Sequence, residues 1–120
     1  MTVITVCTTC RRGEAREDRT LPPCGEAMLA LVEYSARDAT AVTVRGTACL
    51  MGCEHGCNVA ISAPGKMSYV LGSFAPEAES AEALVTYAAL HAESEEGVVA
   101  YKQWPSGVKG HFVARVPPLD

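Results

Sequence analysis

Thr2-Val-Ile-Thr-Val6 stands near the start of the chain and consists entirely of β-branched residues. Such side chains lose little freedom in an extended backbone and pack well on a pleated sheet, so the run predicts a buried first strand. The strand ends at Cys7, which is the first of six cysteines in the chain. The sequence therefore places a reactive side chain at the carboxyl end of the first predicted element.

Patterns of strands and helices continue along the next part of the sequence. A helix is predicted from Cys24 to about Arg37, because apolar residues recur there at helical spacing and Pro23 stands just before it. The other expected elements are strands over 41–45, 59–63 and 67–71, with a Pro64-Gly65 turn between the last two, and a helix over 77–91.

This order of elements predicts an α/β fold. A strand–helix–strand unit makes its two strands parallel, and the hairpin then adds two antiparallel strands. We expect a small mixed four-stranded sheet covered by helices (β-α-β-β-β-α), which is the arrangement of a trimmed thioredoxin-like fold. The chain is expected to form a single domain over residues 1–120, with a core over about 2–91 and a C-terminal extension over 92–120 that contains short extended pieces at 98–101 and 111–116.

Composition excludes several classes of function. The chain has 120 residues, of which 48% are hydrophobic and 20% charged, so it can bury a core of its own and is not a disordered tail. A net charge of −4 argues against nucleic acid as the main partner. We find neither an apolar run long enough to span a membrane nor a secretory signal, and we therefore expect a cytoplasmic protein.

The six cysteines are the unusual feature of this composition, and they fall into two groups. Export signals are missing and the cysteines stand beside Gly and Pro at the ends of elements, so disulfide staples and unrelated core cysteines are both disfavoured. A thiolate site for a metal or a cluster is favoured instead. The cysteines are Cys7, Cys10 and Cys24, and then Cys49, Cys53 and Cys57.

Four of these cysteines are expected to converge. Cys7 ends one strand and Cys49 follows its parallel neighbour, and parallel strands place their carboxyl ends at one edge of a sheet. Cys24 begins the helix that joins these strands, where the free N–H groups favour a thiolate. Cys53 follows Cys49 closely enough to bind the same ion or cluster. Zinc and an iron–sulfur cluster both suit such a four-thiolate set.

Two alternatives rest on the pair Cys7-Thr-Thr-Cys10. Together with Cys49 and Cys53 it has the spacing of a structural zinc site, so a zinc or other metal-binding module remains open. The same pair could act as a dithiol redox enzyme, as in thioredoxins. That reading is weaker, because a polar loop beginning at Arg11 follows the pair where a helix would be needed to lower the pKa of the first thiol.

Val6-Cys7 at the end of the first expected strand, Cys24 at the start of the first helix, Cys49-x-x-x-Cys53-x-x-Gly56 and a Pro64-Gly65-x-x-x-Tyr69 turn resemble the thioredoxin-like [2Fe–2S] ferredoxins over about residues 2–91. A second set of motifs extends over nearly the whole chain: Val6-Cys7-Thr-Thr-Cys10-Arg11, Cys49-Leu50-x-x-Cys53-x-x-Gly56-Cys57-x-Val59-Ala60, Ala63-Pro64-Gly65-Lys66, Trp104-x-x-x-Val108 and Val116-Pro117-Pro118-Leu119. This set resembles, more narrowly, a small bacterial family of uncharacterised proteins that are predicted to bind metal. The resemblance implies a thioredoxin-like fold, a [2Fe–2S] cluster, a homodimer, and electron supply to a cobalamin or metal-related pathway.

The resemblance also implies a ligand set. By position, Cys7, Cys24, Cys49 and Cys53 fall where the ferredoxin ligands lie. Cys10 is a reserve ligand because of its spacing, and Cys57 is another, standing where the ferredoxins carry Pro. The expected function is an electron carrier with no substrate of its own.

Two features near the expected cysteine ligands can each be interpreted in two ways. Arg11 and Arg12 stand beside the expected ligands, and they either form a docking rim for an acidic redox partner protein or belong to a solvated loop. His55, between two cysteines, is either a ligand that would raise the reduction potential or an exposed loop residue.

Overall fold

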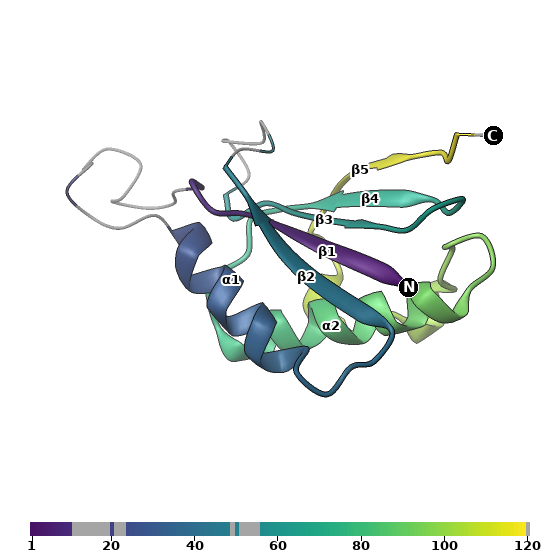
Figure 1. Cartoon of the computed structure of the whole chain (residues 1–120), viewed down its shortest axis with the longest axis horizontal. Coiled ribbons are helices and arrows are strands. Elements are labelled where there is room, and N and C mark those ends of the chain that lie inside the picture. The colour runs from purple at the N-terminus through teal and green to yellow at the C-terminus, as the bar shows by residue number, and fades with distance from the viewer. Residues whose placement is uncertain (11–19, 21–23, 49, 51–55, 120) are drawn as a thin grey trace.

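Five strands form one mixed sheet in the order β2-β1-β3-β4-β5 (Figure 1). The structure is a computed structural model and describes residues 1–10, 20, 24–48, 50 and 56–119. The strands are β1 (Thr2–Cys7), β2 (Val42–Thr47), β3 (Val59–Ser62), β4 (Ser68–Leu71) and β5 (Phe112–Val116).

β1 lies between β2 and β3 in the strand order and sets the register of these three strands. It pairs in parallel with β2, from Thr2 opposite Val42 to Cys7 opposite Thr47. On its other side it pairs antiparallel with β3, where Val6 lies opposite Val59. Because β1 and β2 are parallel, both carboxyl ends lie at the same edge of the sheet.

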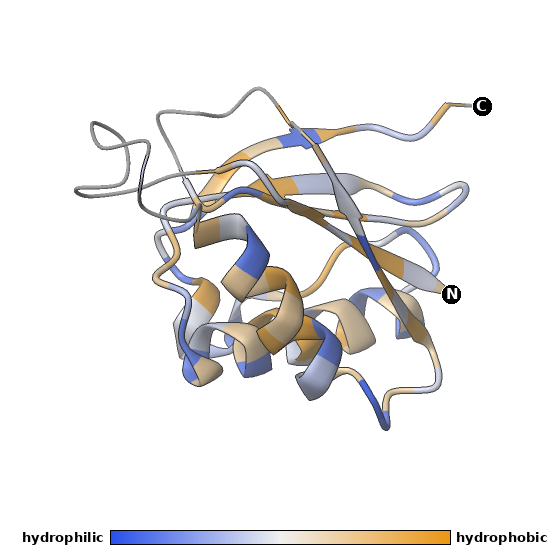
Figure 2. Ribbon diagram, turned by 60° about the vertical axis from the view of Figure 1, so that its left-hand side comes forward, coloured by the Kyte–Doolittle hydropathy of each residue, from blue (hydrophilic) through white to orange (hydrophobic). Residues whose placement is uncertain are grey.

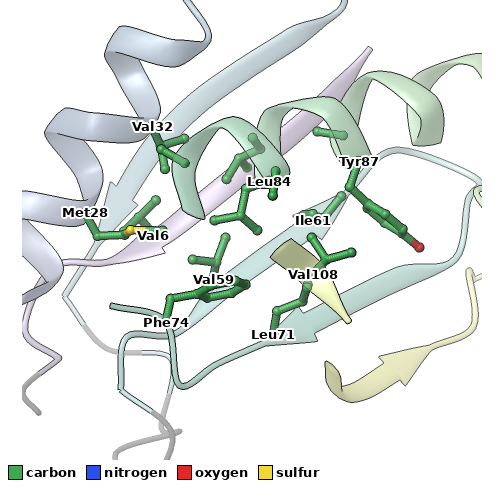
Figure 3. Packing of buried hydrophobic residues seen from close by; sticks show 14 of the residues in the cluster. Val6, Met28, Val32, Val59, Ile61, Leu71, Phe74, Leu84, Tyr87 and Val108 are labelled. Carbon is green, nitrogen blue, oxygen red and sulfur yellow. The ribbon is translucent and has the colours of Figure 1, made fainter. Parts of the chain in front are cut away.

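Two helices pack side by side on one face of this sheet (Figures 1 and 2). α1 (Cys24–Ser35) connects β1 to β2, and α2 (Ala78–Glu93) follows the β3–β4 hairpin. The core lies between the helices and the sheet (Figure 3). Its fully buried side chains include Val6, Val59, Ile61 and Leu71 from the sheet, Met28 and Val32 from α1, Leu84 and Tyr87 from α2, and Phe74 and Val108 from connecting segments.

The expectation of a four-stranded sheet was wrong, because a fifth strand follows α2. β5 pairs antiparallel with β4, with Arg115 opposite Tyr69. The physical reason is the ring of Phe112, which packs edge-on against Tyr69 and Tyr87 at centroid distances of 5.6 and 5.4 Å. Val108 is also fully buried. The C-terminal extension beyond residue 91 therefore adds a strand to the sheet and side chains to the core.

The other differences are local. Residues 98–101 do not form a strand, and Tyr101 instead begins a 3₁₀ helix, Tyr101–Gln103, which is followed by a second one over Ser106–Val108. α1 ends at Ser35, two residues before the predicted end, and β2 begins at Val42 instead of residue 41 and runs to Thr47. None of the helices in the described ranges is long and apolar enough to cross a membrane.

A buried histidine connects helix α2 to the sheet, at the end of β1 that lies away from Cys7. His91 is fully buried near the end of α2. Its Nε2 lies 2.7 Å from the carbonyl oxygen of Met67, which can only accept, so Nε2 carries the proton. Nδ1 then accepts a hydrogen bond of 2.8 Å from the hydroxyl of Thr2. Neutral His91 thus links α2 to the start of β1 and to the residue before β4.

We expect this histidine to make folding stability depend on pH. Burial lowers the pKa of His91, the hydrogen bond to the Met67 carbonyl opposes this in part, and the charges of Lys66 and of the N-terminal amine add smaller decreases. The unfolded chain therefore binds the proton first as the pH falls. Stability should be constant above about pH 6.5 and should fall below it by up to ~1.4 kcal/mol per pH unit.

Urea unfolding between about pH 5 and pH 8 measures this slope. In His91→Gln the part of the slope that comes from this residue should disappear, although the variant is less stable at every pH. A wild-type slope that persists unchanged in His91→Gln would contradict the assignment.

Candidate functional site

Four cysteines lie close together at the end of β1. Cys7 is the last residue of β1, Cys10 follows it after a turn, Cys24 begins α1, and Cys57 stands two residues before β3. Cys7, Cys10 and Cys57 are buried, whereas Cys24 is half-buried. The structure therefore brings together two of the first-choice ligands, Cys7 and Cys24, and both of the reserve ligands, Cys10 and Cys57.

Backbone hydrogen bonds hold these cysteines in place. The N–H of Cys7 donates to the carbonyl of Asn58 at 3.0 Å, which continues the β1–β3 pairing by one residue. The N–H of Gly25 donates to the carbonyl of Cys10 at 3.2 Å, and the sulfur of Cys24 lies 3.4 Å from the same carbonyl oxygen. The first turn of α1 is thus docked onto the chain that leaves β1, and this satisfies one of the free N–H groups of the helix.

Gly25 is required for this close approach. A Cβ atom built on Gly25 would overlap the carbonyl oxygen of Cys7 and would lie 2.8 Å from the carbonyl carbon of Thr8. Both are backbone atoms, so neither can move without displacing the end of β1. The glycine beside Cys24 therefore allows the start of α1 to contact the strand that carries Cys7.

The thiols of Cys7 and Cys10 hydrogen-bond to each other, and their pKa values shift in opposite directions. Burial alone would raise the pKa of Cys7, but hydrogen bonds from Cys10, the Leu50 backbone and Thr9 outweigh it, and the pKa is lowered. Burial raises the pKa of Cys10, and so does the hydrogen bond to Cys7, against opposing hydrogen bonds from Asn58. Cys7 is therefore the better thiolate of the pair.

Asn58 is a site residue that the sequence analysis missed. Its side chain is fully buried, and its Nδ2 donates to the sulfur of Cys10 at 3.2 Å. Its backbone N–H donates to the same sulfur at 3.4 Å. Two N–H groups directed at one sulfur stabilise negative charge on that sulfur. The only signal available in the sequence was the position of Asn58 directly after Cys57.

The sulfur atoms of Cys24 and Cys57 are joined as a disulfide. The two residues are 33 positions apart in the sequence and their Cα atoms are 6.4 Å apart. Cys7 and Cys10 are free thiols. Disulfides were disfavoured from the sequence, and this pair shows that one first-choice and one reserve ligand are close enough to bond to each other or to one shared partner.

The remaining predicted site residues lie outside the described residues. These are Cys49 and Cys53, together with Arg11, Arg12 and His55. Their neighbours in sequence do reach the site: the carbonyl of Ala48 lies 3.9 Å from the sulfur of Cys7, and the backbone of Leu50 hydrogen-bonds to that sulfur. Within the described ranges, no group of three or more His, Cys, Asp or Glu side chains is placed to hold a metal ion.

Comparison with known proteins supports only the narrower of the two resemblances, and only in that the chain matches an uncharacterised family. No curated protein and no solved structure matches the chain. A family profile described as "Protein of unknown function (DUF1636)" matches residues 4–118, which is nearly the whole length. The chain therefore belongs to the DUF1636 family.

Proposed function

We propose that this chain is an electron carrier in which cysteine thiolates hold a [2Fe–2S] cluster at the carboxyl edge of β1 and β2. The observation that supports it best is the meeting of Cys7, Cys10, Cys24 and Cys57 at that edge, from three separate parts of the sequence. A cluster needs several soft thiolate donors in one region, and the described residues bring four cysteines to this edge, two of them joined as the Cys24–Cys57 disulfide.

The proposal includes a thioredoxin-like fold. Its support is the topology of the first four strands, in which β1 and β2 are parallel and joined by α1, while β3 and β4 form an antiparallel hairpin that leads into α2. β5 is then an addition to the outer edge of β4.

Cys7, Cys24, Cys49 and Cys53 remain the first-choice ligands, and Cys10 and Cys57 remain the reserve. Support for Cys7 comes from Ala48 and Leu50, the sequence neighbours of Cys49, because both contact the sulfur of Cys7. Support for Cys24 comes from its place at the start of α1, where the helix dipole stabilises a thiolate. Cys24 can serve as a ligand only after the Cys24–Cys57 disulfide has been reduced.

The chain's own residues provide what a cluster needs around its ligands. When bound, a [2Fe–2S] cluster supplies reversible one-electron transfer. Hydrogen bonds to sulfur and burial adjust the potential of such a cluster. Asn58 supplies two hydrogen bonds to the sulfur of Cys10, and Cys7, Cys10 and Cys57 are buried.

Purification without oxygen tests this function. We expect a coloured protein that contains about two irons and two sulfides per chain. A colourless protein that retains zinc, and that takes up no iron when iron, sulfide and a dithiol reductant are added, would instead identify the metal-binding module that the sequence left open.

A second candidate function is dithiol–disulfide exchange. The observation that favours it is the presence of one disulfide, Cys24–Cys57, beside a pair of free and hydrogen-bonded thiols, Cys7 and Cys10. If this function holds, the protein should be metal-free, and mass spectrometry after thiol labelling should show a disulfide between Cys7 and Cys10 that forms and breaks reversibly.

A further inference from the structure

The outer edge of β5 is the most exposed apolar part of the described structure. β5 pairs with β4 on one side, and no other strand of the described chain pairs with it (Figure 1). Four of its five residues are exposed. Of the large hydrophobic side chains that are exposed, Val98, Tyr101, Val113, Val116 and Leu119 belong to β5 or to the segments that flank it. Unpaired backbone groups on such an edge are a template for another strand.

A cavity of about 330 Å³ lies beside this edge. Its walls are mainly aromatic and apolar, with the rings of Tyr69, Trp104 and Phe112 among them, and Arg115 is its charged residue. The ring centroids of Trp104 and Phe112 are 4.6 Å apart, and the indole N–H of Trp104 is bonded to the carbonyl of Val99 at 2.9 Å. The cavity is therefore a preformed apolar recess next to a free strand edge.

The charge of this surface is opposite to that of the chain. Residues 98–119 contain Lys102, Lys109 and Arg115 and no Asp or Glu, whereas the whole chain has a net charge of −4. In the described part of the chain, none of these three cations forms an ion pair with a carboxylate. Lys109 lies over the ring of Tyr101, with its Nζ 4.8 Å from the centroid. The surface thus presents positive charge beside apolar groups.

We propose that β5 is a docking strand for an extended acidic segment of a partner protein, in which apolar side chains alternate with carboxylates. The segment would add a sixth strand beside β5, insert an apolar side chain into the cavity, and pair a carboxylate with Arg115. A second copy of this chain fits less well, because a twofold pairing of β5 with itself would bring Arg115 of each copy to the same edge.

Trp104 reports binding directly, because it is the only tryptophan in the chain and it lines the cavity. The probe is a synthetic peptide of about eight residues in which Val and Glu alternate, and its control has Lys in place of Glu. We expect the acidic peptide to shift the Trp104 emission and to bind at least about tenfold more tightly than the basic peptide, with a preference that weakens as salt is added.

Two charge reversals complete the test. Arg115→Glu should weaken binding of the acidic peptide by about tenfold or more, because it removes the cation beside the cavity. Arg37→Glu, in the turn that follows α1 and paired with Asp38, is the matched control and should leave binding unchanged. Both side chains are exposed, so both variants should fold. Far-ultraviolet circular dichroism checks this.

Three results would overturn the proposal. The first is no shift of Trp104 emission with either peptide, and the second is equal binding of the two peptides. The third is a homodimer in analytical ultracentrifugation that Arg115→Glu dissociates, because the occupant of the β5 edge would then be a second copy.

Discussion

Cys24→Ser protein purified without oxygen is expected to retain less than about a tenth of the wild-type iron and to lose its colour. Cys24 begins α1, and its sulfur lies within hydrogen-bonding distance of the Cys10 carbonyl, inside the cysteine site. A serine hydroxyl is a harder and less acidic donor than a thiol, so it binds iron of a cluster poorly. Iron analysis and the visible absorption spectrum measure the loss.

Cys57→Ser is the matched control for this change. Both substitutions remove the Cys24–Cys57 disulfide, so they affect the covalent link equally. Only Cys24 is a first-choice ligand, and we therefore expect Cys57→Ser to keep the cluster. Cys49→Ser and Cys53→Ser should lose it as Cys24→Ser does. A protein that loses iron through Cys57→Ser but keeps it in Cys24→Ser would show that the ligand set is wrong.

Gly25→Ala is expected to destabilise the fold by more than about 3 kcal/mol, which lowers the melting temperature by roughly 10 °C or more. The added methyl group would overlap the carbonyl oxygen of Cys7, and the nearest other atoms also belong to the backbone. α1 would have to move away from β1, and the hydrogen bond from the Gly25 N–H to the Cys10 carbonyl would break. The site should lose iron for the same reason, although no ligand has changed.

Glu26→Ala is the comparison for this effect, because Glu26 is exposed in the same turn of α1. It should change stability by no more than about 0.5 kcal/mol. Thermal unfolding followed by circular dichroism measures both variants. If Gly25→Ala melts within a few degrees of Glu26→Ala, α1 does not need its contact with the end of β1, and the described packing at the site is incorrect.

The elements that were predicted accurately are those whose patterns are local. The β-branched run of β1, the helical spacing of α1 and the Pro64-Gly65 turn between β3 and β4 all depend on nearby residues, and the structure confirms them within two residues at most ends. The rule that parallel strands end at one edge of a sheet predicted that Cys7 and Cys49 converge, and Cys49 lies outside the described residues. Cys24 was expected beside Cys7 because it begins the helix that joins the two strands, and the structure places it there.

The extended piece expected at 111–116 contains β5, but its pairing with β4 as a fifth strand could not be predicted in the same way. Phe112-Val-Ala-Arg-Val116 lacks a clean alternation of apolar and polar residues, and four of its residues stay exposed. Its place depends on the packing of Phe112 against Tyr69 and Tyr87, which are 43 and 25 positions earlier in the sequence. A pattern that is read along the chain contains no information about such distant contacts.

The contact of Asn58 with the cysteine site could not be predicted for a related reason. It lies opposite Cys7 because Val6 pairs with Val59, and this register is a property of the folded sheet. The Cys24–Cys57 pair likewise depends on how the start of α1 meets the residues before β3. Two of the contacts that define the site thus join segments whose relative position the sequence does not state.

The position of β1 between β2 and β3 has a consequence for the order of events during synthesis. β1 leaves the ribosome first, but its neighbours β2 and β3 begin at residues 42 and 59. At translation rates of about 5–20 residues per second, the Cys7 and Cys10 thiols wait for seconds before Asn58 and Cys57 exist to cover them. The nascent chain therefore exposes these thiols to oxidants and to stray metal ions, and a complete site can form only after the β3–β4 hairpin has been made.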